Sequence, residues 1–81
     1  MFYSLAEMKN AQQETDQARQ WYEKASAADP WWGKPLYKLA LLALDKGDRQ
    51  SAAKLFDRAI AVDPVSAEAA LAKTALDHLN R

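Results

Sequence analysis

The stretch AAKLFDRAIAVDP, residues 52–64, decides the fold, because a related stretch, ARQWYEKASAADP, occupies residues 18–30. Paired positions in the two stretches keep side-chain size or chemistry. The pairs are Ala18 with Ala52, Tyr22 with Phe56, Lys24 with Arg58, Ala25 with Ala59, and Pro30 with Pro64. The same offset pairs Tyr3 with Tyr37 and Leu5 with Leu39. So many matches at one constant offset indicate an internal repeat, with the period set by the distance from Pro30 to Pro64.

The composition favours helices. The 81 residues include 17 alanines but only five β-branched residues. Alanine is the best helix former, whereas β-branched residues are typical of strands. We therefore expect an all-α chain with five helices, at about residues 2–12, 15–28, 34–46, 49–62 and 66–80.

Turn and capping residues set the expected helix ends. Gly47 suits a left-handed helix C-terminus, and Asp48 can cap the helix that follows. Pro30 and Pro64 each follow an aspartate and disfavour helical geometry at that residue. Ser66 is the expected cap of the last helix.

On these residues the chain resembles the tetratricopeptide repeat family, which stacks helix–turn–helix units with the same period. The residues that carry the resemblance are the small Ala18, Ala25, Ala52 and Ala59, the aromatic Tyr22 and Phe56, and the closing Pro30 and Pro64. The resemblance covers nearly the whole chain and implies a right-handed α-α superhelix. It divides one domain, residues 1–81, into a repeat at about 1–32, a second at about 33–66, and a C-terminal capping helix at about 67–81.

The last helix has a broad apolar arc and an opposite polar arc. The apolar arc contains Val65, Ala69, Leu71, Ala72, Ala75, Leu76 and Leu79. A continuing array would need apolar residues on the other side, where Lys73, Thr74 and Asp77 stand. We therefore expect this helix to be a solvated cap, which repeat arrays need at their ends.

The first helix has additional apolar residues beyond its core face, namely Phe2, Met8 and Ala11. We interpret them as a surface for stacking. Either the chain is the C-terminal end of a longer array, or it forms a homo-oligomer through this N-terminal helix.

Charge and composition argue against several function classes. The chain has 11 basic and 11 acidic residues, so it lacks the basic excess that binds nucleic acid. Its longest apolar run, Leu39 to Leu44, is far shorter than the ~20 residues of a membrane span. Residues 1–10 contain Glu7 and lack a basic region followed by a long apolar stretch, so we expect no signal peptide there. We expect a soluble protein without membrane insertion, with the cytoplasm favoured.

Catalytic and metal-binding patterns are absent from the sequence. The chain has no cysteine and one histidine, His78, on the polar arc of the last helix. No phosphate-binding glycine motif or zinc-protease motif occurs. We therefore predict no enzyme activity, no cofactor and no metal site.

The resemblance implies instead a protein or peptide partner in a concave groove lined by the first helix of each unit. It places nine main residues there: Tyr3, Glu7, Asn10, Lys34, Tyr37, Lys38, Leu41, Leu44 and Leu71. The alternative for Leu41 and Leu44 is that they pack against the first and last helices. The groove lacks the full lysine, asparagine and arginine set with which some family members hold peptide carboxylates, because Tyr3 and Glu7 occupy two of those positions.

Two adjacent tryptophans, Trp31 and Trp32, lie between the predicted repeats. In one interpretation both rings fill the space between helix ends, with their N–H groups reaching water or a carbonyl. In the other they are exposed interface anchors, because tryptophan is enriched in binding hot spots.

Overall fold

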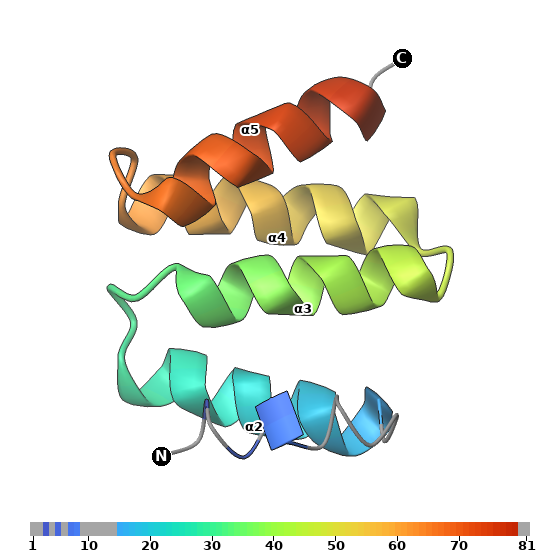
Figure 1. Cartoon of the computed structure of the whole chain (residues 1–81), viewed down its shortest axis with the longest axis vertical. Coiled ribbons are helices and arrows are strands. Elements are labelled where there is room, and N and C mark those ends of the chain that lie inside the picture. Colours follow the sequence, from blue (N-terminus) through green and yellow to red (C-terminus); the bar gives the residue numbers. More distant parts are fainter. Residues whose placement is uncertain (1–2, 4, 6, 9–14, 80–81) are drawn as a thin grey trace.

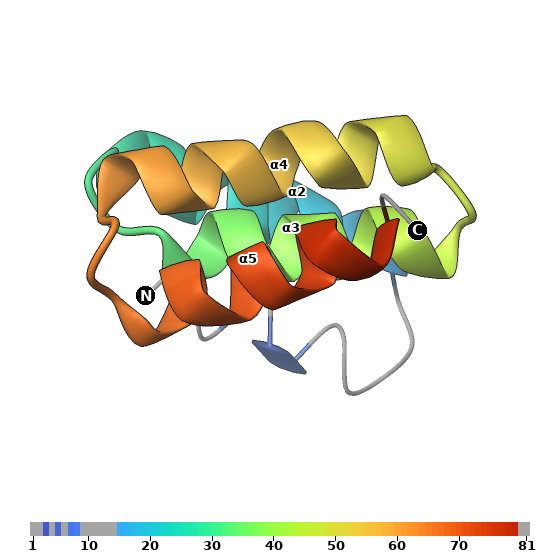
Figure 2. The same cartoon turned by 90° about the horizontal axis from the view of Figure 1, so that it is seen from above.

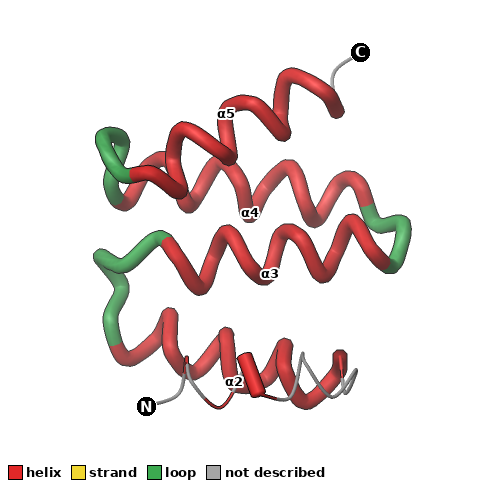
Figure 3. Tube along the Cα trace, viewed as in Figure 1, coloured by secondary structure: helices red, strands yellow, loops and turns green. Residues whose placement is uncertain are grey.

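The computed structural model describes residues 3, 5, 7, 8 and 15–79. Four helices follow one another: α2 (Thr15–Ala28), α3 (Lys34–Asp45), α4 (Arg49–Val62) and α5 (Ala67–Leu79). Figure 1 shows them stacked along the long axis, each running opposite to the one before. Short loops connect them, and the described residues contain no strand (Figure 3). The expectation of an all-α helical repeat fold is confirmed.

The helix ends follow from local chemistry. The backbone N–H of Ser51 donates to the Asp48 carboxylate at 3.1 Å, which caps α4. The N–H of Ala69 donates to the Ser66 hydroxyl at 3.0 Å, which caps α5. Gly47 has φ of 81°, the left-handed conformation that ends α3 at little cost for glycine. All three predicted end signals are confirmed.

The core consists of two clusters on either side of α3. Tyr22 of α2 is fully buried in the first, with Ala18, Leu36 and Leu39. Phe56 of α4 is fully buried in the second, with Ala40, Ala52 and Ala72. The paired aromatic residues of the repeat therefore occupy equivalent places, and the small alanines beside them allow the helices to approach closely.

The helices form two layers when viewed from above (Figure 2). α2 and α4 lie on one side, and α3 and α5 lie on the other. The loop after α2 approaches α4 closely, because a Cβ atom added at Gly33 would lie 3.0 Å from the carbonyl oxygen of Ala59. Glycine at this position therefore allows the two repeats to pack together.

The structure corrects the apolar arc predicted for the last helix. Val65 is 94% exposed and lies in the turn before α5, and Leu71 is 52% exposed. The reason is that α5 packs chiefly on α4 and only slightly on α3, so one narrow stripe suffices to bury it. Lys73, Thr74 and Asp77 are exposed.

The predicted first helix falls only partly within the described residues. Residues 3, 5, 7 and 8 are helical. Phe2, Asn10, Ala11 and the expected end of that helix lie outside the described residues.

Candidate functional site

The repeat register brings several predicted site residues to one side of the molecule. Tyr3, Tyr37 and Leu71 occupy equivalent positions of successive repeats and come from the N-terminal helical residues, α3 and α5. We call the surface formed by Tyr3, Glu7, Lys34, Tyr37, Lys38, Leu41 and Leu71 the α3–α5 face. Asn10, which is also predicted there, lies outside the described residues.

Aromatic rings gather where the N-terminal residues meet the α2–α3 loop. The ring centre of Tyr3 lies 4.9 Å from that of Trp32 and 5.6 Å from that of Tyr22. The Lys34 ammonium lies 5.4 Å from the centre of the Tyr3 ring, which is a cation–π distance. Tyr3 therefore links the loop, α2 and α3 into one surface.

The two adjacent tryptophans behave differently. Trp32 packs on Tyr3 and keeps 37% of its surface exposed, whereas Trp31 is 78% exposed. The chain turns here, with the Trp32 N–H donating to the Asp29 carbonyl at 3.1 Å. The interpretation in which both rings fill the space between helix ends is therefore wrong for Trp31.

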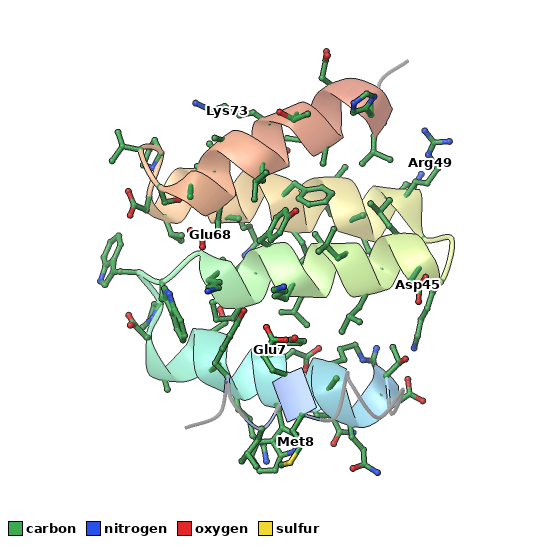
Figure 4. All side chains as sticks on the ribbon, viewed as in Figure 1. Glu7, Met8, Asp45, Arg49, Glu68 and Lys73 are labelled. Atoms are coloured by element: carbon green, nitrogen blue, oxygen red, sulfur yellow. The ribbon has the colours of Figure 1, made fainter. Side chains whose placement is uncertain are left out.

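A small polar cluster lies beside these rings. The Lys38 ammonium is 3.7 Å from a carboxylate oxygen of Glu7, and Figure 4 shows Glu7 reaching toward α3. Burial raises the pKa of Tyr3 well above its ordinary value, and a hydrogen bond with Glu7 adds to this. Burial likewise raises the pKa of Tyr22 to about 12, with the Glu7 charge as the next cause. The Tyr22 hydroxyl is buried and has no well-aligned hydrogen-bond partner among the described residues.

Leu41 and Leu44, for which the sequence left two interpretations open, differ in their exposure. Leu44 is partly buried against the Phe56 cluster. Leu41 is 37% exposed on the outside of α3. Packing therefore accounts for Leu44, and Leu41 remains available at the surface together with Leu71.

Sequence reasoning missed two adjoining cavities between α2 and α4, on the opposite side of the molecule. Their volumes are about 350 and 330 Å³. Arg19, Glu23 and Arg58, which stand at the rim, had no feature in the sequence that distinguished them from solvated surface charges.

The candidate site is a surface of exposed and partly exposed side chains. No three histidine, aspartate or glutamate side chains come together there in a way that could hold a metal ion. His78 is exposed. None of the helices formed by the described residues has the length and apolar character needed to cross a membrane.

The stacked antiparallel helices and the repeat register define an all-α helical repeat protein. Residues 34–66 match the tetratricopeptide repeat family, and the chain therefore contains a tetratricopeptide repeat. A comparison with curated proteins found no match. Tetratricopeptide repeats generally mediate protein–protein interaction and are typically non-catalytic.

Proposed function

We propose that this chain is a non-catalytic interaction module that binds a segment of a partner protein through the α3–α5 face. The proposal takes residues 1–81 as one domain, with repeats at about 1–32 and 33–66 and a capping helix at about 67–81. The observation that carries it is the exposure of Leu41 and Leu71, at 37% and 52%, on neighbouring helices. Packing among the described residues leaves this part of both leucines uncovered.

The residues around the two leucines suit a peptide. Tyr37 packs against both core clusters and is partly exposed, so it adds aromatic surface to the α3–α5 face. Aromatic side chains at the centre of an interface contribute much of the binding energy. Lys34 and Lys38 are partly exposed at the polar edge, where they can fix the orientation of a bound segment. An amphipathic segment with an apolar stripe fits this arrangement.

A peptide selection tests the proposal. Peptides selected from a random displayed library against the wild-type chain are measured by fluorescence polarisation against Leu41→Glu and Leu71→Glu. We expect each substitution to weaken binding at least about tenfold, because burying an unpaired carboxylate costs well over about 1.4 kcal/mol. Val65→Glu is the matched control, because Val65 is more exposed than either leucine but lies in a loop.

Two outcomes of the peptide selection would contradict the proposal. If the selected peptides bind the two leucine variants as tightly as the wild type, the α3–α5 face is not the binding surface. If Val65→Glu weakens binding as much as they do, the effect of added charge is general and the leucines have no special part.

Self-association is the alternative function, and Met8 favours it. The side chain of Met8 is 49% exposed and points away from the stack (Figure 4). Sedimentation at several concentrations tests this alternative. A dimer that dissociates in the Met8→Glu variant would support it, and a monomer at all concentrations would exclude it.

A further inference from the structure

The two cavities on the α2–α4 side adjoin each other, and we call them together the groove. Glu23, Leu39 and Arg58 line both of them, so the cavities meet at these residues. Leu39 of α3 is common to both cavities. The charged side chains of the first cavity come from α2 (Arg19 and Glu23), from the turn between α3 and α4 (Lys46 and Asp48) and from α4 (Arg58). The lining on α2 runs from Arg19 to Ala27, which corresponds to roughly 12 Å at the helical rise.

The two cavities differ in chemistry. Arg19, Lys46 and Arg58 bring positive charge to the first cavity, and Glu23 and Asp48 bring negative charge. The second cavity has the apolar Ala27, Pro30 and Leu36 beyond the junction, with Ser26 beside them. Most of the charged side chains therefore lie in the first cavity, and the second has only Glu23 and Arg58, which it shares with the first.

Several of these charges are already engaged. Lys46 contacts the Asp16 carboxylate at 2.7 Å, and Asp48 accepts the cap bond from Ser51. Among the described residues, neither Arg19 nor Arg58 forms an ion pair within 4.0 Å. Among the described residues, the charges at the groove that form neither an ion pair within 4.0 Å nor a cap hydrogen bond are thus two arginines and one glutamate.

We propose that this groove binds a small monocarboxylate with an aliphatic chain. Its carboxylate lies in the first cavity between Arg19 and Arg58, because a guanidinium group binds carboxylate with two parallel hydrogen bonds. Its aliphatic chain passes over Leu39 into the second cavity, against Leu36 and Pro30. The two arginines outnumber Glu23, so these three residues give the groove a net positive charge that complements a carboxylate.

The size of the groove favours a small molecule over a protein. Binding pockets for small molecules have volumes of roughly 300–1,000 Å³, whereas a stable protein interface buries roughly 800 Å² on each partner. Each cavity lies at the lower end of the small-molecule range. Glu23 makes the groove selective for ligands with a single carboxylate. A second carboxylate at the far end of the ligand would lie in the second cavity, where the only basic lining residue is Arg58 at the junction.

Octanoate is the probe, and backbone amide NMR shifts of the ¹⁵N-labelled chain are the measurement. We expect saturable shifts at Arg19, Leu39, Leu42, Ser51 and Arg58, with a Kd on the order of millimolar for a ligand of this size. Octanol, which has the same chain without charge, and octanedioate, which has a second carboxylate, should each bind about fivefold more weakly.

Charge substitutions complete the test. The double variant Arg19→Gln, Arg58→Gln should weaken octanoate binding about fivefold and leave octanol binding unchanged. Lys73→Gln is the matched control, because it also removes a positive charge, on α5 away from the groove (Figure 4). Circular dichroism of each variant verifies that the helices are intact.

Three outcomes would overturn the proposal. The first is equal binding of octanol and octanoate, which would show that the arginines do not recognise the carboxylate. The second is an equal loss in Lys73→Gln, which would indicate a general charge effect. The third is an absence of saturable shifts, or shifts confined to Tyr37, Leu41 and Leu71 on the opposite side.

Discussion

Replacing Phe56 with alanine should remove most of the stability of this chain. Phe56 is fully buried among Ala40, Ala52 and Ala72. Its ring centre lies 5.8 Å from that of Tyr37. Because these neighbours come from α3, α4 and α5, the substitution leaves a cavity where three helices meet.

The free energy of unfolding should fall by about 4–5 kcal/mol, which is in the upper half of the range for such substitutions. Truncating a core phenylalanine costs about 3–5 kcal/mol, from lost transfer energy and the cavity left behind. Two features favour the upper half of that range. The fully buried alanines beside the ring are too small to fill the cavity, and the aromatic pair with Tyr37 adds about 0.5–1.5 kcal/mol. At roughly 0.05–0.15 kcal/mol per residue, 81 residues provide roughly 4–12 kcal/mol in total.

Urea unfolding followed by circular dichroism measures the loss, with trimethylamine oxide added if the variant is unfolded in water. Val65→Ala is the control, and because Val65 is almost fully exposed its free energy of unfolding should stay within about 0.5 kcal/mol of the wild type. A loss below about 2 kcal/mol for Phe56→Ala, with an unchanged m-value, would refute the reasoning that Phe56 anchors three helices.

Other substitutions and pH changes test the packing and the helix ends. Ala52→Leu should cost about 1–3 kcal/mol in thermal unfolding, because Ala52 is fully buried where α4 crosses its neighbours; a melting temperature equal to the wild type would contradict this. Gly47→Ala should cost about 1 kcal/mol, because φ of 81° strains any residue with a Cβ; calorimetry would detect it. Hydrogen bonds from Ser51 lower the pKa of Asp48 below its ordinary 3.8. The stabilisation by the ionised Asp48 cap is therefore present above about pH 4 and is lost as the pH falls through the lowered pKa. Asp48→Asn should flatten that part of an acid-unfolding profile. Burial raises the pKa of Tyr22 from 10.0 to about 12, so its contribution to stability is complete below pH 10 and is lost between pH 10 and 12; Tyr22→Phe should reduce that alkaline loss.

The helices could be predicted because their signals are local. The cap of α4 joins Asp48 to a residue three positions later, and the cap of α5 joins Ser66 to Ala69 in the same way. Such contacts depend on a few neighbouring residues and not on the rest of the chain. The burial of Tyr22 and Phe56 also followed from the sequence, because the repeat gives both the same neighbours.

The candidate surface was predicted less completely. The register placed Tyr37 and Leu71 at equivalent positions, but it did not separate Leu41, which is exposed, from Leu44, which packs near Phe56. Trp31 and Trp32 are neighbours in sequence, but Trp32 packs on Tyr3 whereas Trp31 is mostly exposed, and a contact so distant in sequence has no local signal. The helical wheel puts Val65 on the apolar arc, but its place in the turn before α5 leaves it in solvent.

The sequence by itself determined the repeat, the helices, their ends and the two aromatic core residues, because period, caps and small residues act over short distances or recur with the period. The tertiary structure alone decided which apolar residues are exposed and whether α2 and α4 leave a groove between them. Those features depend on the distance and angle between whole helices, which are set by the sum of many contacts across the core. Arg19 and Arg58 come from different repeats, far apart in sequence, and share one cavity for this reason.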